Sequence, residues 1–452
     1  MRRFYIISSL ILISLQIHAQ YIAKSQAVAD IDFYDKTLRE VHYNPFLYVS
    51  EAQYLKKIDS LKNNLPDSIE IRPFTLKMGE LTSVIKDGHT TPSLIQSAFQ
   101  VDFRKKIFFP FSFVADKKSN VYALTSFQGT EIPKGAQIIS INGTDLSQFY
   151  KKGATLIGGI EAYRQELAIK LLGYNLYLSG IKPPFNVEYI YNKQKQQKTI
   201  AEGTILKDLL GNAFPSILGK SYTFKIIENK VGYIDLISMG SNYKIFNKFF
   251  DSCFSEIRTK KVNTVAIDLR KNTGGNSIIA DLLISYFNKD KYILSAAKYW
   301  KISDTYKKSI IANGDTSSTY LKKNSNTIWE FINCDAKDPM FITDTVFNGK
   351  VFIITGPMTF SSANMLADGV KTFKMATLIG EPTGENTSDF GEVYRFNLPN
   401  SKIMMQVTTS FDLGADCKDK TKHPVIPDKL IKTTYLDQIN GIDPVINYLL
   451  KQ

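Results

Sequence analysis

Residues 349–381 read GKVFIITGPMTFSSANMLADGVKTFKMATLIGE, and this stretch decides the fold of the chain. The run at 351–355 is β-branched and aromatic, which predicts a short buried strand ended by a Gly-Pro pair. Small and apolar residues then recur at helical spacing over 365–373, and a second buried strand follows at 376–379. The order of strand, helix and strand predicts an α/β core with parallel strands.

Two serines, Ser361 and Ser362, lie between the first strand and the helix. A hydroxyl at the start of a helix meets free backbone N–H groups and the positive end of the helix dipole. Those groups stabilise a negative oxygen beside the hydroxyl, as acyl transfer requires. A serine there also serves as a simple helix cap, so this stretch alone leaves a nucleophile and a cap open.

A second loop between a strand and a helix carries two glycines. A buried strand is predicted at 264–269, and Gly274 and Gly275 follow it within a loop. Glycine lets the backbone approach a ligand closely and turns N–H groups outward. In an acyl-transfer site these N–H groups would form half of an oxyanion hole, and the N–H of Ser362 the other half. By themselves the glycines fit a tight turn equally well.

The length of 452 residues allows two or three domains. Residues 1–19 have the features of a secretory signal peptide: Arg2 and Arg3, an apolar run at 5–15 and a small-residue cleavage site. That run is too short for a membrane span. We therefore expect an exported chain with no stable membrane span.

Charge and cysteine content argue against several function classes. The formal net charge is +13, but the lysines are scattered, and their densest patch, 193–198, fits a solvated hairpin tip rather than a nucleic-acid site. Cys253, Cys334 and Cys417 lie far apart without CxxC spacing, which predicts neither a disulfide framework nor a zinc site. An oxidising compartment would allow one disulfide and leave one thiol over. The sequence contains no cluster of ligand residues, so we expect neither a metal nor an organic cofactor.

The chain divides into three segments after residue 19. Residues 20–100 carry helical periodicity, broken at 42–46 by a proline, and predict an N-terminal helical domain. Residues 105–205 consist mostly of predicted strands and form a small α+β module. Residues 220–450 alternate strands and helices around a polar stretch at 291–333, which we expect to be an insertion or a surface hairpin.

Histidine is scarce, which narrows the choice of a general base. After the signal segment only His42, His89 and His423 remain. His89 follows a predicted helix in the sequence KDGHT, where Asp-Gly signals a turn. A loop histidine is often a surface residue, but histidine is also the usual general base near neutral pH.

A series of motifs, taken in chain order, resembles those of the S41 serine peptidases, which include tail-specific (C-terminal processing) and tricorn-like proteases. The motifs are HYNPF at 42–46, KDGHT at 86–90, DLRKNTGG at 268–275, TFSSAN at 359–364, ATLIGEPTG at 376–384 and HPVIPD at 423–428. Residues 132–143 are similar to the strand-turn-strand of a PDZ domain, a module of this family. The resemblance implies an α/β fold with a ClpP/crotonase-like catalytic core, an N-terminal helical domain and a PDZ-like module.

The same resemblance implies roles for individual residues. Ser361 aligns with the nucleophile, and Ser362 with the oxyanion-hole residue that follows it. Gly274 or Gly275 would supply the other N–H group. The peptidase domain would cover 220–450.

One departure from the family pattern bears on the choice of base. Members with a Ser-Lys pair carry the lysine in an FGKG segment, where this chain has Asn386. The tricorn-like branch uses a histidine base, and His89 matches its DGHT context. Asp419 lies at a separation from Ser361 that suits an acid orienting the histidine. A solvated surface charge is the alternative for Asp419.

The leading interpretation is an exported serine endopeptidase that cleaves peptides or unfolded protein C-termini with a serine nucleophile and a histidine base. Its partner would be a peptide or protein substrate. A peptidase fold that has lost its chemistry and only binds peptides is one alternative. A crotonase-type acyl-CoA enzyme is another, but acyl-CoA is cytoplasmic and the predicted signal segment argues against it.

Overall fold

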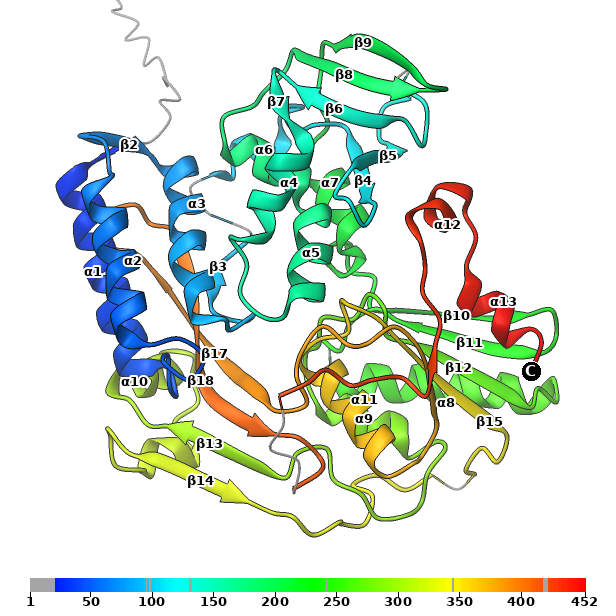
Figure 1. The fold of residues 1–452 in the computed structure, drawn as a ribbon. Helices are drawn as coiled ribbons and strands as arrows, with labels where there is room; N and C mark the ends of the chain where they lie inside the picture. The colour runs from blue at the N-terminus through cyan, green and yellow to red at the C-terminus, as the bar shows by residue number, and fades with distance from the viewer. Residues whose placement is uncertain are drawn as a thin grey trace, which may run out of the picture.

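The computed structural model describes residues 21–94, 96, 99–129, 132–240, 242–343, 345–417 and 422–452. The expected signal segment and Asp419 lie outside these ranges. Figure 1 shows the chain running from a helical group (blue), through a sheet (cyan to green), to a parallel sheet with flanking helices. Within the described ranges no helix combines the length and the apolar character that crossing a bilayer needs.

The N-terminal group contains three helices that pack together over a shared apolar core. They are α1 (Lys24–Val41), α2 (Glu51–Asn63) and α3 (Ile71–Thr82). Strand β1 (Tyr21–Ala23) pairs antiparallel with β2 (Ser68–Glu70) beside them. Their apolar positions recur at helical spacing and are buried, as Tyr34, Leu38 and Phe74 illustrate. A short 3-10 turn, Ser83–Ile85, and left-handed Lys86 end α3 and turn the chain toward His89.

The middle of the chain forms a second sheet, in the order β4-β5-β6-β8-β9 with β7 beside β6. Its strands are β4 (Phe111–Ala115), β5 (Val121–Ser126), β6 (Gln137–Ile141), β7 (Thr144–Asp145), β8 (Phe185–Tyr191) and β9 (Gln194–Ile200). Helices α4 (Leu146–Ala154), α5 (Glu161–Lys170), α6 (Leu172–Leu178) and α7 (Leu206–Ala213) accompany it. The lysine-rich patch at 193–198 lies on the β8–β9 hairpin, and β4 is an edge strand.

The C-terminal half is built on a sheet in the order β10-β11-β12-β15-β16-β19, in which every pair except β10–β11 is parallel. The strands are β10 (Tyr222–Ile227), β11 (Val231–Leu236), β12 (Thr264–Asp268), β15 (Lys350–Thr355), β16 (Thr377–Gly380) and β19 (Lys429–Leu430). The helices are α8 (Tyr243–Thr259), α9 (Ile278–Ile284) and α11 (Ser362–Thr372). The carboxyl ends of β12, β15 and β16 are in register, so the loops that follow them meet at one edge.

A fourth sheet, in the order β14-β13-β18-β17, connects the helical group to the parallel sheet (Figure 1). Its strands are β13 (Ala297–Lys301), β14 (Ile328–Ile332), β17 (Asp389–Asn397) and β18 (Met404–Leu413), and α10 (Asp304–Ala312) lies between β13 and β14. The stretch at 291–333, expected to be an insertion or a hairpin, is a hairpin that extends this sheet. Strand β3 (Thr91–Pro92) pairs with β18 directly after His89 and fixes the position of that loop.

The C-terminal segment returns to the middle sheet through α12 (Tyr435–Asn440) before α13 (Pro444–Leu449) ends the chain. The ring of Tyr435 stacks on Tyr122 of β5 with 4.8 Å between centroids. Cys334 and Cys417 form a disulfide, and Cys253 is free and buried in α8.

Candidate active site

Ser361 occupies a strained turn between β15 and α11. Its φ of 55° and ψ of −131° lie in a region that glycine adopts readily and other residues avoid. Ser361 is the N-cap residue of α11, yet its side chain makes no capping hydrogen bond. The hydroxyl of Ser362 donates to the Gly275 carbonyl at 2.7 Å. Neither hydroxyl therefore acts as the helix cap that the sequence left open.

Hydrogen bonds between two loops hold this turn in place. The Thr359 hydroxyl donates to the Leu269 carbonyl at 2.9 Å and accepts from the Gly356 amide at 3.0 Å. The amide of Phe360 donates to the Asn272 carbonyl at 3.1 Å. The loop after β12 is thereby fixed against the residues just before Ser361.

The two glycines lie close to the serines, and their amides differ. Gly274 has a φ of +100°, and a Cβ atom there would lie 2.6 Å from the Ser361 Cβ and 3.0 Å from the Ser362 amide nitrogen. The Gly274 amide donates to Asn272 Oδ1 at 2.9 Å. The amides of Gly275 and Ser362 have no such acceptor among the described residues. Of the two predicted glycine donors, Gly275 is the one whose N–H remains available to an oxyanion.

His89 lies beside the serine turn, on the loop that follows α3. Its backbone is fixed by an amide that donates to Asp87 Oδ1 at 2.8 Å and a carbonyl that accepts from Gln406 Nε2 at 2.7 Å. Its ring packs on the ring of Phe360, with 4.6 Å between centroids. Its Nδ1 lies 3.4 Å from Glu385 Oε1 and 3.7 Å from Asp87 Oδ1.

Glu385 contacts both the histidine and the serine. It belongs to the loop between β16 and β17, and its side chain is 4% exposed. While Oε1 faces His89, Oε2 accepts the Ser361 amide proton at 2.5 Å. One carboxylate therefore connects the two residues that the sequence nominated as base and nucleophile.

Asp87 accepts several hydrogen bonds that hold the His89 loop in place. It is fully buried, and its Oδ2 accepts from the hydroxyls of Thr90 at 2.5 Å and Thr408 at 2.8 Å. His42 Nε2 lies 3.3 Å from the same oxygen, while His42 Nδ1 accepts the Asn44 amide at 3.1 Å. Because Nδ1 is an acceptor, the proton of a neutral His42 is on Nε2 and points to Asp87. Contacts with His42 and His89 outweigh burial and hold the pKa of Asp87 well below its usual range.

The acidic surroundings change the pKa of His89. Burial lowers it, but the charges of Glu385, Asp87 and Asp389 outweigh burial and raise the pKa to about 9. Burial raises the pKa of Glu385 to about 8, with the charge of His89 opposing it. Burial and the charge of Asp87 raise the pKa of Asp389 to about 7. Carboxylates on one side of the imidazole thus stabilise its protonated form.

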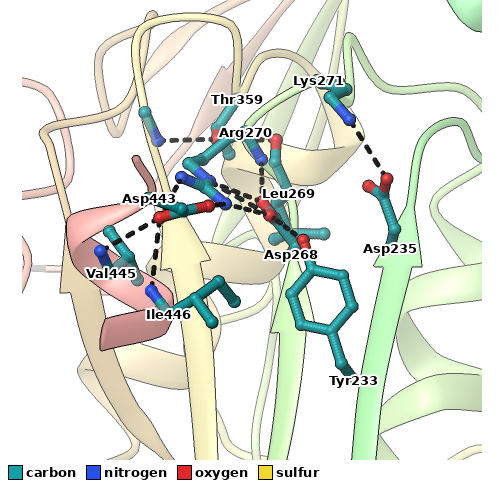
Figure 2. A network of polar contacts seen from close by, with 11 residues as sticks. Tyr233, Asp235, Asp268, Leu269, Arg270, Lys271, Thr359, Asp443, Val445 and Ile446 are labelled. Atoms are coloured by element: carbon teal, nitrogen blue, oxygen red, sulfur yellow. Dashed lines mark hydrogen bonds and ion pairs between the residues drawn. The ribbon is translucent and has the colours of Figure 1, made fainter. Parts of the chain in front are cut away.

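A further polar network anchors the glycine loop to the C-terminus (Figure 2). The Arg270 guanidinium contacts Asp268 at 2.6 Å and Asp443 at 2.7 Å. Asp443 also caps α13 through the amides of Val445 and Ile446. Tyr233 donates to Asp268 at 2.5 Å. The strand end at Asp268, from which the glycine loop starts, is therefore tied to the last helix.

The structure brings together five of the six residues nominated from the sequence: Ser361, Ser362, Gly274, Gly275 and His89. The sixth, Asp419, lies outside the described residues. Sequence reasoning missed Glu385, which stood next to the residue whose identity excluded a lysine. Its buried position depends on how the loop folds back onto Ser361, and no local pattern indicates that. No group of His, Cys, Asp or Glu side chains able to hold a metal occurs in the described ranges.

Solved structures of known proteins share the fold of this chain. Mature CPAF in complex with lactacystin shares 13% identity with this chain, over 95% of this chain and 97% of that one, with a TM-score of 0.65. Mature CPAF without that compound shares 14% identity over 95% of this chain and 96% of that one, with a TM-score of 0.64. The photosystem II D1 C-terminal processing protease shares 13% identity over 92% of this chain and 96% of that one, with a TM-score of 0.44. No curated protein matches the chain.

The likeness to CPAF establishes the mixed α/β fold. The profile of peptidase family S41 matches residues 230–431, which include the glycine loop and the serine turn. Residues 230–431 therefore form a peptidase family S41 domain.

Proposed function

We propose that this chain is an exported serine endopeptidase that cleaves peptides or unfolded protein C-termini, with Ser361 as nucleophile and His89 as general base. The Ser361 hydroxyl gives its proton to His89 and attacks the scissile carbonyl carbon. The N–H groups of Gly275 and Ser362 stabilise the resulting oxyanion. His89 then protonates the leaving amine, and a water molecule releases the acyl-enzyme. Export rests on the signal-like segment at 1–19.

The observation that carries this proposal is the backbone of Ser361. A non-glycine residue at φ 55° is costly, and such strain gathers at functional turns that aim a nucleophile from a strand end over a helix N-terminus. Because the Ser361 hydroxyl makes no capping bond, the turn offers no structural reason for a serine. The neighbouring imidazole of His89 supplies the base such a hydroxyl needs.

The acid of the mechanism has two candidates. The resemblance nominates Asp419, which remains a prediction because it lies outside the described residues. Glu385 faces His89 Nδ1 at 3.4 Å within them. An acid at Nδ1 leaves Nε2 for the serine hydroxyl, as in other serine triads.

We also propose that the substrate binds along the middle sheet. We propose that residues 105–205 form a PDZ-like module and 20–100 a helical domain, beside a peptidase domain at 220–450. A cavity of about 320 Å³ runs between edge strand β4 and helix α5 and reaches Pro357 and Glu381. An extended peptide added to the β4 edge would lead toward the serine turn.

The decisive experiment is covalent labelling with a fluorophosphonate probe, combined with hydrolysis of a denatured protein substrate. We expect labelling and cleavage by the wild-type chain and by Ser362→Ala, which keeps the backbone amide, and neither by Ser361→Ala. Labelling that persists in Ser361→Ala but disappears in Ser362→Ala would assign the nucleophile to Ser362. Peptide binding without labelling of the wild-type chain would favour the non-catalytic alternative.

A further inference from the structure

The loop that carries Glu385 is fixed on both sides, so its acidic side chain is directed inward. The Gly384 amide donates to the Thr359 carbonyl at 3.0 Å, and a Cβ atom at Gly384 would lie 2.0 Å from the Pro357 carbonyl oxygen. On the other side, Asn364 Nδ2 donates to the Asn386 carbonyl at 2.7 Å. The loop is thereby pressed against the residues around the serine turn.

A carboxylate in this position is held by few groups, and each has a place in the mechanism. Its contacts are the Ser361 amide at 2.5 Å and His89 Nδ1 at 3.4 Å. Burying an anion without partners is costly, so the hydrogen bond from the Ser361 amide and the charge of the nearby imidazole are what compensate it. Glu385 and Asp87 both lie close to Nδ1 of His89, at 3.4 Å and 3.7 Å, so negative charge gathers at that nitrogen.

The surroundings of Glu385 are otherwise acidic or aromatic. Asp87 on the loop after α3 and Asp389 at the start of β17 add negative charge that raises the pKa of Glu385. Tyr163 of α5 and Tyr48 before α2 feel the charge of Glu385, which together with burial raises the pKa of each. His89 is the one cationic group that faces Glu385 among these neighbours, so the two depend on each other for charge balance.

We propose that Glu385 is a positioning residue of the active site, whose carboxylate holds His89 by Nδ1 and the Ser361 turn by its amide. The inference rests on the proposed roles of Ser361 and His89 and adds the residue that aligns them. With Nδ1 directed to the carboxylate, Nε2 is the atom left to accept the serine proton. With the Ser361 amide held, the strained turn keeps its backbone conformation at the start of α11.

Glu385→Gln tests this role because it keeps the shape and removes the charge. The glutamine oxygen can still accept the Ser361 amide, which leaves its NH₂ group facing His89 Nδ1. Nδ1 then becomes an acceptor, and a neutral His89 carries its proton on Nε2, where it cannot accept another. Loss of the negative charge also lowers the pKa of His89.

The first readout does not depend on catalysis. The chain carrying Ser361→Ala is labelled with ¹³C-histidine, and the His89 pKa is measured by NMR titration with and without Glu385→Gln. We expect the substitution to lower the His89 pKa by at least about one unit, as removal of an adjacent opposite charge does. The matched control is Glu392→Gln, which removes an exposed carboxylate paired with Lys298 and should leave the His89 pKa within about 0.3 units. An equal His89 pKa with and without Glu385→Gln overturns the proposal.

The second readout is kinetic. We expect Glu385→Gln to lower kcat by about 100-fold or more with KM changed less than about threefold, because the substitution affects a proton-transfer geometry and not a binding surface. The acidic limb of kcat/KM should move to lower pH. A limb that moves in Asp419→Asn but not in Glu385→Gln overturns the proposal and assigns the acid to Asp419.

A conservative variant separates positioning from folding. Glu385→Asp keeps the charge but is one methylene too short to span both contacts, so we expect a His89 pKa near that of the wild type and a reduced kcat. Full activity in Glu385→Asp overturns the proposal. If the wild-type chain shows no labelling or turnover, the proposed function fails, while the NMR titration still decides whether Glu385 holds His89.

Discussion

Replacing Ser361 by glycine should make the chain more stable than replacing it by alanine, although both variants lose the proposed nucleophile. Alanine keeps a Cβ atom at φ 55° and ψ −131° and therefore keeps the backbone strain. Glycine removes the strain, because it adopts positive φ without a steric penalty. The Ser361 hydroxyl makes no capping hydrogen bond, so its loss is the same small change in both variants.

The magnitude follows from two opposing effects. A non-glycine residue in such a region costs about 1–3 kcal/mol. The greater freedom of glycine in the unfolded chain offsets about 0.5–1 kcal/mol of the relief. We expect Ser361→Gly to exceed Ser361→Ala by about 1 kcal/mol, which raises Tm by about 2–4 °C in a cooperative unit of 150–250 residues.

The assay is urea and thermal unfolding followed by circular dichroism, and the neighbouring residue provides a control of opposite sign. Ser362 is the first residue of α11, where glycine is about 0.5–1 kcal/mol worse than alanine. Both Ser362 variants lose the same bond to Gly275. Glycine should therefore stabilise at 361 and destabilise at 362. The same sign at both positions would falsify the strain argument.

Three further predictions concern activity. His89→Ala should lower kcat/KM by about 10²–10⁴-fold, whereas Lys371→Ala, which removes only an ion pair to Asp428, should stay within about twofold; an inactive lysine variant beside an active His89→Ala would refute the histidine base. Gly274→Ala should abolish measurable cleavage and destabilise the folded chain by about 2 kcal/mol or more, because its Cβ would lie 2.6 Å from that of Ser361. The control Gly143→Ala, at positive φ in open space, should keep its activity. A fully active Gly274→Ala would contradict the close packing. The rate should rise with pH as His89 loses its proton, with the limb displaced from the ordinary value of about 6.5 toward the pKa of about 9; a limb at about 6.5 would mean that the carboxylates do not act on the imidazole of the free enzyme.

The displaced limb also changes what a pH profile can decide. From sequence, a histidine base predicts a limb near about pH 6–7, and a limb well above about pH 8 would indicate a lysine. The carboxylates of Asp87, Glu385 and Asp389 bring a histidine into the range of a depressed lysine. Only variants of His89 and Glu385, compared at several pH values, separate the two bases.

The sequence predicted those elements whose buried residues form a regular pattern within the element itself. Strands β12 and β15 are continuous apolar runs, and α11 carries a regular apolar stripe, so period and composition sufficed. Strand β14 gave no such signal, because it is an edge strand with mostly exposed positions. Its place in a sheet depends on β13 and on the distant β18, which local periodicity does not encode.

The candidate site divides in the same way. Ser361, the glycine loop and His89 were nominated because they stand in short local motifs that resemble those of the S41 peptidases, and the glycines also mark a backbone at positive φ. Glu385 left no mark, since an acidic residue in a loop is ordinary until the fold buries it. Asp87 was visible as a turn residue, but its buried contacts with Thr408 and His42 join segments far apart in the chain.

This chain departs from the Ser-Lys pattern at two neighbouring residues, Glu385 and Asn386, which lie in the loop between β16 and β17. Residue 386 is asparagine where a Ser-Lys enzyme has its base, and the preceding residue, Glu385, is an acid in contact with the Ser361 amide. A lysine ammonium beside Glu385 and Asp389 would form an ion pair, and its pKa would rise rather than fall toward neutrality. The same acids favour a histidine that must hold a proton during catalysis. The acidic loop therefore suits a histidine base and opposes a lysine base, so that the identity of residue 385 and the absence of a lysine at 386 support one mechanism.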